Sequence, residues 1–236
     1  MEQYYKIANL LVKMDSFGRT VAQAEKYLAE PGEPDVVIRS NRGLVKERAP
    51  HLSDDDCEYL ATGGSFYQQL LSFDGMMLHA SAVVMDGKAY LFTANSGTGK
   101  STHTGLWLRQ FGERAWLLND DKPALRLENG LWYAYGTPWS GKHDLSRNEG
   151  AVLAGICCLS RGETNSICPL DTKTAIFRIL EQTARPPVYQ LREKLLELMD
   201  SLITKVPIWT MACNMEPEAA LMSYQAMSGA NQKENG

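Results

Sequence analysis

A glycine-rich segment near the middle of the chain carries residue types that bind phosphate groups. Residues 94–101 read ANSGTGKS, which follows the phosphate-loop pattern G-x-x-x-x-G-K-[ST] except for an alanine at its first position. Gly97 and Gly99 allow the backbone to curl until successive N–H groups face one anion. Lys100 would supply positive charge to the β- and γ-phosphates, and Ser101 a hydroxyl to Mg²⁺. The spacing therefore predicts a site for nucleotide phosphates.

The segments on either side of this loop have patterns that suit it. Residues 78–85 (LHASAVVM) and 88–93 (KAYLFT) are predicted to be two strands joined by Asp86-Gly87, a strong hairpin signal. A helix is predicted over 99–111, and its positive N-terminal end would face the same anion. The predicted nucleotide-binding residues are Asn95, Ser96, Gly97, Thr98, Gly99, Lys100, Ser101 and Thr102.

Two adjacent acids follow the next predicted strand. Residues 114–119 (RAWLLN) end in Asp120 and Asp121, and Asp120 lies 20 residues after Lys100. A right-handed crossover would make this strand parallel to 88–93 and bring both carboxyl ends to one edge of the sheet. We therefore assign Asp120, with the loop serine, to Mg²⁺. Adjacent residues of an extended chain point to opposite sides, so Asp121 is assigned instead as general base for an incoming hydroxyl; a solvated turn is the alternative for both acids.

A histidine in the hairpin is the third catalytic candidate, beside Lys100 and Asp121. If the hairpin pairs through its Asp-Gly turn, His79 lies in a strand opposite residues 94–95 and beside the phosphates. There it would be a polar ligand near the γ-phosphate or the metal. A buried structural histidine is the alternative.

Residues 136–150 are predicted to form a polar loop that is longer than most connections. Lys142 and Arg147 could contact a transferred phosphate or an acidic substrate, and Trp139 could form a wall of the pocket. An ordered surface loop with scattered charge explains the same residues equally well.

Length and composition indicate a folded protein with a sizeable core. The chain has 236 residues, of which 22% are charged and 44% hydrophobic, and this excludes the disordered classes. A net charge of −4 removes the usual electrostatic reason to expect nucleic-acid or anionic-membrane partners. No apolar run approaches the roughly 20 residues of a membrane span, and the N-terminus is unlike a secretory signal. We therefore expect a cytoplasmic protein whose five cysteines are reduced and mostly buried.

The remaining patterns predict an α/β fold with a mixed sheet and C-terminal helices. We expect an N-terminal accessory region over residues 1–75, whose strands and helices could pack on the same core, and a phosphate-loop domain over 76–230. Strands are predicted at 4–14, 35–39, 124–127, 131–135, 151–159 and 206–213, helices at 21–29, 53–72, 172–184, 188–204 and 217–227, a loop at 40–50, and a frayed tail at 229–236.

With LHAS at 78–81, SGTGKS at 96–101 and LLNDD at 117–121, residues 76–140 resemble the catalytic domain of HPr kinase/phosphorylase. They resemble more distantly the nucleotide-binding part of ATP-dependent phosphoenolpyruvate carboxykinase. The resemblance implies a mixed-sheet P-loop kinase fold and a serine kinase. The positions that would take the family's active-site roles are His79, Lys100, Ser101, Asp120 and Asp121.

The chain also departs from that family. Residues 1–75 do not resemble the usual N-terminal domain of the bifunctional HPr enzyme, and 136–165 lack the glycine-rich signature of the reverse, phosphate-releasing reaction. The likeness is closer to shorter HPr-kinase-related proteins, some of which modify peptides.

The leading hypothesis is a kinase that uses ATP and Mg²⁺ to phosphorylate a hydroxyl, with a serine of a protein or peptide as the first choice of acceptor. A small-molecule kinase and a non-catalytic ATP-binding regulatory module are the alternatives. A carboxykinase is disfavoured because the chain is too short for that family's extra substrate domain. Whether copies of the chain form a homo-oligomer stays open.

Overall fold

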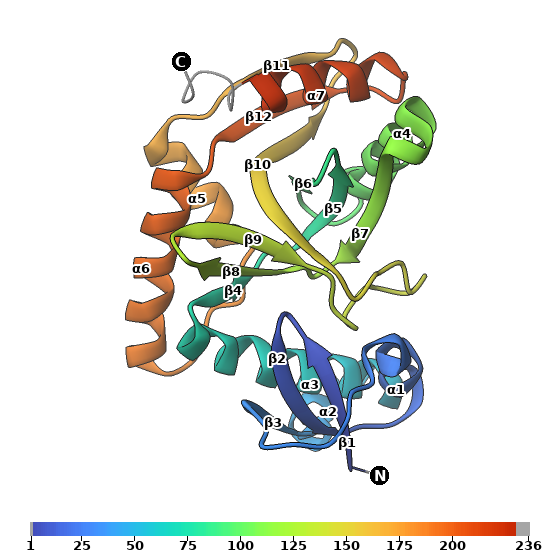
Figure 1. Ribbon diagram of the computed structural model, residues 1–236, viewed down its shortest axis with the longest axis vertical. Helices are drawn as coiled ribbons and strands as arrows, with labels where there is room; N and C mark the ends of the chain where they lie inside the picture. The colour runs from blue at the N-terminus through green and yellow to red at the C-terminus, as the bar shows by residue number, and fades with distance from the viewer. Residues whose placement is uncertain (1, 230–236) are drawn as a thin grey trace.

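Within residues 2–229, the part of the chain that the computed structural model describes, nine strands form one mixed sheet (Figure 1). Its main path is β4-β8-β9-β10-β6-β5-β7, and β12 and β11 continue from β10. The strands are β4 (Gly75–Met77), β5 (Ala80–Met85), β6 (Lys88–Thr93), β7 (Ala115–Asp121), β8 (Ala124–Glu128), β9 (Leu131–Tyr135), β10 (Gly150–Arg161), β11 (Ser166–Pro169) and β12 (Ile208–Cys213). The predicted α/β class with a mixed sheet is confirmed, whereas the predicted frayed tail lies, apart from Gly229, outside the described residues.

The connection from β6 to β7 brings the ends of two distant strands to one edge of the sheet. β5 pairs antiparallel with both β6 and β7, so these two strands run parallel to each other, as predicted, with β5 between them. Ala80 lies opposite Thr93 of β6 and opposite Asp121 of β7. The glycine-rich loop that follows β6 and the acids that end β7 therefore meet at the same edge.

Helices cover both faces of this sheet. Side chains of β6 alternate: Leu91 belongs to a buried cluster with residues of α5 (Thr172–Glu181) and α6 (Tyr189–Lys205), whereas Tyr90 and Phe92 belong to one with α4 (Lys100–Phe111) and α7 (Glu218–Gly229). A strand buried on both faces needs consecutive apolar residues, and the middle of β6, Ala89 to Phe92, meets that need. No helix among the described residues has the length and apolar character needed to cross a membrane.

The N-terminal residues form a second, three-stranded sheet with its own helices (Figure 1). Its elements are β1 (Glu2–Ile7), β2 (Leu10–Asp15), α1 (Gly18–Ala24), β3 (Val36–Arg39), α2 (Arg42–Arg48) and α3 (Asp54–Leu70). Short 3₁₀ helices follow α1 at Glu25–Tyr27 and α3 at Leu71–Phe73, and another joins α4 to β7 at Gly112–Arg114. The single strand predicted at 4–14 is wrong, because Ala8 and Asn9 adopt positive φ angles of 50° and 62° and fold it into a hairpin. The loop predicted at 40–50 is also wrong, since α2 occupies most of it.

The long helix predicted from Ser53 is present as α3, and the Ser53 hydroxyl accepts a hydrogen bond from the backbone N–H of Asp56 at 3.0 Å. Gly63 and Gly64 lie in the middle of this helix and do not interrupt it. Gly63 leaves space for the side chain of Trp139. A Cβ added at Gly63 would come within 2.9 Å of Cδ1 of Trp139.

Trp139 is completely buried and stacks on Phe66 with ring centroids 4.9 Å apart. Its predicted place in a pocket wall is therefore wrong: it belongs to the core that the N-terminal residues share with the 136–149 loop.

Candidate functional site

The glycine-rich loop presents unpaired backbone donors at the sheet edge. The N–H groups of Ser96, Gly97 and Gly99 form no hydrogen bond with any described residue, and the loop is exposed from Asn95 to Gly97. Gly97 and Gly99 have φ angles of 75° and 124°, which side-chain-bearing residues rarely adopt. Ala94 is not among the positive-φ residues, so alanine costs nothing at that position. Free amides in such a curl form a concavity that suits an anion.

Lys100 begins α4 and reaches back across the loop. Its Nζ donates to the carbonyl oxygen of Ala94 at 3.0 Å. Burial lowers the pKa of Lys100, and the nearby Asp121 and Asp120 only partly oppose that effect. The ammonium group is thus held at the loop, close to both acids.

Ser101 and Asp120 are brought together although they are far apart in sequence. The Ser101 hydroxyl donates to Oδ1 of Asp120 at 2.9 Å. The backbone N–H of Asp120 donates to the carbonyl oxygen of Leu145, which attaches the 136–149 loop to the end of β7. Among the described residues, no three His, Cys, Asp or Glu side chains gather closely enough to hold a metal ion by themselves.

Asp121 has a different set of partners, as expected for the neighbour of Asp120 in a strand. Its Oδ1 lies 3.3 Å from Nε2 of His79, and its Oδ2 accepts from the Tyr59 hydroxyl at 2.8 Å and from Nζ of Lys122. Burial alone would raise the pKa of Asp121, but the hydrogen bonds from His79, Lys122 and Tyr59 outweigh it and hold the pKa well below its usual range. The carboxylate is therefore ionised and oriented by three donors.

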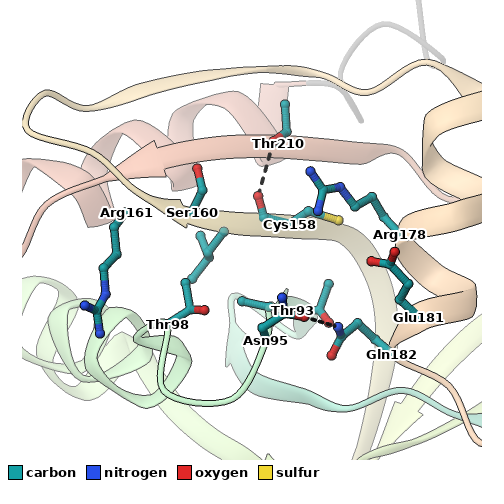
Figure 2. Close-up of a pocket in the computed structure, with 12 residues that line it drawn as sticks. Thr93, Asn95, Thr98, Cys158, Ser160, Arg161, Arg178, Glu181, Gln182 and Thr210 are labelled. Atoms are coloured by element: carbon teal, nitrogen blue, oxygen red, sulfur yellow. Dashed lines mark hydrogen bonds between the residues drawn. The ribbon is translucent and has the colours of Figure 1, made fainter.

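His79 connects this carboxylate to the glycine-rich loop through a glutamine of α5's C-cap. The residue directly precedes β5 rather than lying in it, and its backbone N–H donates to the carbonyl oxygen of Gln182 at 2.7 Å. Nδ1 of His79 lies 3.2 Å from Oε1 of Gln182, whose Nε2 donates to Oδ1 of Asn95 at 3.0 Å. Figure 2 shows Gln182 reaching from α5 to Asn95. A continuous chain of polar contacts thus runs from Asp121 through His79 and Gln182 to Asn95.

Two pockets flank the loop. The one we call the α5-side pocket has a volume of about 290 Å³ and is shown in Figure 2; it is lined by residues that include Asn95, Cys158, Ser160, Arg178, Gln182 and Thr210. The other, the α4-side pocket, has a volume of about 490 Å³ and is lined by residues that include Thr102, His103, Gly162, Cys213, Asn214 and Met215. Thr98 and Arg161 line both.

Most of the residues singled out in the sequence meet here. The predicted binding residues occupy the loop and the first turn of α4, and Asp120, Asp121 and His79 lie at the same edge. The two cationic side chains predicted to contact a phosphate from the 136–150 loop do not reach the glycine-rich loop. The guanidinium of Arg147 stacks over the ring of Trp116 at 4.7 Å, and Lys142 has no contact with residues 94–101.

Sequence reasoning missed four residues of this arrangement. Lys122 was interpreted only as part of a turn, although its place next to Asp121 in the sequence could have indicated that the two side chains pair. Asn119, which is completely buried, fixes the turn after β7 by accepting from the backbone N–H of Lys122 at 2.9 Å and donating to the carbonyl oxygen of Thr137. Tyr59 and Gln182 gave no local signal.

The comparisons with known proteins find similarity to solved structures. No protein-family model matches the chain, and no curated protein matches its sequence. Among solved structures, the HPr(Ser) kinase/phosphatase from Coxiella burnetii matches 68% of this chain and 99% of its own, with 16% identity and a TM-score of 0.40.

Proposed function

We propose that this protein is a kinase that transfers the γ-phosphate of ATP to a hydroxyl, with a serine of a protein or peptide as acceptor. One observation carries the proposal: the free amides of the glycine-rich loop, the Lys100 ammonium and the Ser101–Asp120 pair share one sheet edge. Amides and an ammonium are the groups that cradle a polyphosphate, and an acid beside them is the group that accompanies its metal ion.

The donor set at this edge fits Mg²⁺. Mg²⁺ keeps several waters and is held by one or two carboxylates together with substrate phosphates, so it needs few protein ligands. Ser101 and Asp120 offer two neighbouring oxygens and would hold the ion. When bound, it would neutralise charge on the transferred phosphoryl group. Asp121 carries two donors, Tyr59 and Lys122, on Oδ2 and only His79 on Oδ1, so we assign the ion to Asp120 and leave the second lone pair of Oδ1 for the acceptor hydroxyl.

The roles proposed for the three catalytic residues follow from their contacts. Lys100 would bind the β- and γ-phosphates, and His79, whose two ring nitrogens face Asp121 and Gln182, would orient the Asp121 carboxylate beside the γ-phosphate. The acceptor hydroxyl would donate its hydrogen bond to Asp121 and release its proton to that carboxylate as the new phosphorus–oxygen bond forms and the bond to ADP breaks. A low pKa makes Asp121 a weak base, which is acceptable because phosphoryl transfer through a loose transition state depends chiefly on positioning and charge.

A small-molecule kinase is the second candidate. The α5-side pocket supports it, because a polar pocket of about 290 Å³ beside Asn95 and Gln182, with the Arg178 guanidinium in its lining, would suit a small anionic hydroxyl compound. Transfer to such compounds and not to polypeptides would favour this candidate.

The test combines binding and transfer. ATP with Mg²⁺ should raise the melting temperature, and label from [γ-³²P]ATP should appear in a polypeptide when the protein is incubated with a lysate of its source cell. Lys100→Ala should abolish both effects, whereas Lys142→Ala, an exposed lysine of the 136–149 loop, should preserve both. Asp121→Asn should keep the thermal shift and slow transfer by orders of magnitude. ATP binding with no transfer to any acceptor would instead identify a regulatory ATP-binding module, and no binding at all would refute the proposal.

A further inference from the structure

Few hydrogen bonds hold the glycine-rich loop to the rest of the protein. Within the loop, the backbone N–H of Thr98 donates to the carbonyl oxygen of Asn95 at 3.2 Å. Among the described residues, two side chains from distant parts of the sequence donate to it. Nε2 of Gln182 donates to the Asn95 side chain at 3.0 Å, and Nη2 of Arg161 donates to the carbonyl oxygen of Gly97 at 2.7 Å. The first bond lies where the loop begins, and the second lies in its middle.

The register of the sheet explains why Arg161 can reach the loop. β10 runs parallel to β6, with Cys158 opposite Thr93, the last residue of β6. β6 ends there, whereas β10 continues to Arg161 because β12 pairs with it as far as Cys213. The end of β10 therefore lies alongside the loop, and Figure 2 shows the Arg161 side chain extending from it toward the loop.

The bond from Arg161 fixes one peptide group of the loop at both of its ends. The carbonyl oxygen of Gly97 and the N–H of Thr98 belong to the same planar peptide group. The oxygen accepts from Arg161, and the N–H donates to Asn95. Gly97 has a φ angle of 75° and no side chain, so without these bonds its backbone could adopt many conformations. The fixed peptide therefore holds the neighbouring amides, which have no partner among the described residues, in their curled arrangement.

An ion pair does not explain the position of Arg161. The side chain is exposed, and within the part of the chain that the structure describes no carboxylate pairs with its guanidinium. Ordering a long arginine side chain costs rotamer entropy, which one bond to a single carbonyl group on the surface offsets only in part. A loop that is already curled, however, loses less entropy when it binds an anion, and its affinity for that anion is higher.

We propose that Arg161 is a positioning residue of the phosphate site, which acts through the Gly97–Thr98 peptide to keep the loop amides in the arrangement that an anion needs. In this role the guanidinium does not touch the phosphates. The inference rests on the proposed function, since it takes the loop as the phosphate site.

Replacing the guanidinium by an uncharged side chain tests this role. Arg161→Met should weaken the binding of ATP and of tripolyphosphate by the same factor, about 3- to 30-fold, because both anions use the loop amides. The rate of transfer at saturating ATP should stay within about twofold of the wild-type rate, since the lost interaction favours the ground state and the transition state equally. Arg109→Met removes another exposed cation, in the last turn of α4, and should leave both affinities unchanged.

Salt and amide exchange separate positioning from a direct effect of charge. If Arg161 acts through its hydrogen bond, the factor lost in Arg161→Met should be the same at about 50 and about 500 mM NaCl, because salt screens charges. A factor that falls toward one at the higher concentration would mean that the guanidinium attracts the phosphates, and would overturn the positioning role. In the free protein, the Thr98 amide should exchange with D₂O faster in Arg161→Met than in the wild type when followed by NMR. Unchanged exchange would contradict the proposal.

The remaining outcomes distinguish this inference from the proposed function. If the wild type binds ATP and Arg161→Met binds it equally well, the positioning role is wrong and the proposed function survives. A loss of affinity for ATP but not for tripolyphosphate would assign Arg161 to another part of the nucleotide and would also refute the positioning role. If the wild type binds neither anion, the proposed function fails, and the exchange rates of the Thr98 amide in the free proteins still decide whether Arg161 holds the loop.

Discussion

Replacing Tyr59 by phenylalanine tests whether the N-terminal helix α3 orients the proposed catalytic carboxylate. The Tyr59 hydroxyl donates to Oδ2 of Asp121 at 2.8 Å and accepts the backbone N–H of Gly141 at 2.9 Å. The variant keeps the ring, and with it the stacking of the Arg19 guanidinium at 4.6 Å, but removes these two hydrogen bonds and the longer one that the hydroxyl accepts from Nζ of Lys122 at 3.5 Å. Asp121 would retain Lys122 on the same oxygen, so the carboxylate would be less firmly oriented but still paired.

The expected sizes follow from these two bonds. Leaving the Gly141 N–H without a partner costs about 1–3 kcal/mol of unfolding free energy, which for a chain of this length lowers the melting temperature by roughly 2–12 °C. A hydrogen bond to a charged group contributes about 1.5–3 kcal/mol, so transfer should slow by roughly 10- to 150-fold if that orientation is needed in the transition state. ATP affinity should not change, because the loop and Lys100 keep all their contacts.

The assay compares transfer rate, ATP-induced thermal shift and melting temperature in two tyrosine variants. Tyr67 lies two turns further along α3, and its hydroxyl bonds to the carbonyl oxygen of Lys122 and to Thr137 at 3.1 Å, without touching Asp121. Tyr67→Phe should therefore lower stability by a similar amount but slow transfer much less. Equal transfer rates in the Tyr59 variant and the wild type would refute the positioning role, and equal slowing in both variants would make the effect one of general stability.

Two further predictions concern the loop and the pH dependence of folding. Gly97→Ala should cost about 1–2 kcal/mol by strain at its φ of 75°, since a Cβ there would touch nothing, and it should weaken the ATP-induced thermal shift. Ala94→Gly is the control and should keep that shift; an undiminished shift in both variants would contradict the cradle. Because burial lowers the pKa of His103 to about 4, below an unfolded value near 6.5, the neutral ring's contribution is complete above pH 6.5. It should be lost as the pH falls toward 4, by on the order of 3 kcal/mol. Between about pH 7.5 and 4.5 the melting temperature should therefore fall less in the His103→Gln variant than in the wild type, whereas the exposed His51→Gln variant should follow the wild type.

The part of the site that could be predicted is the part governed by local rules. The Asp86-Gly87 turn fixes the register of β5 on β6, and a helix after the loop requires a return strand in the same sheet. These two facts are enough to bring Asp120 to Ser101, a contact between residues 19 positions apart. Chain connectivity alone therefore predicts this half of the site.

The other half depends on packing between elements that the sequence does not connect. Gln182 reaches His79 across 103 residues and Tyr59 reaches Asp121 across 62, and neither residue belongs to a recognisable pattern. The polar loop around Trp139 allowed either a pocket wall or an ordered surface loop, whereas the side chain is buried in the core, where it packs against Gly63. The helix at 42–48 is equally hidden, since α2 buries none of its residues and shows no apolar stripe.

The packing also connects the residues before 76 to the proposed catalytic carboxylate. α3 contributes Tyr59 to the carboxylate of Asp121 and, one turn later, Gly63 to the bed of Trp139. Trp139 begins the segment that leads to Gly141, where an added Cβ would lie 3.1 Å from the carbonyl oxygen of Asp120. The helix, the 136–149 loop and the two acids are thus in mutual contact: α3 contacts both the loop and Asp121, and the loop contacts Asp120. A shift of α3 along its axis would move the Tyr59 hydroxyl away from Asp121 and the indole away from Gly63 together. Both contacts lie outside the glycine-rich loop, so such a shift would disturb Asp121 without breaking the contact of Lys100 with Ala94.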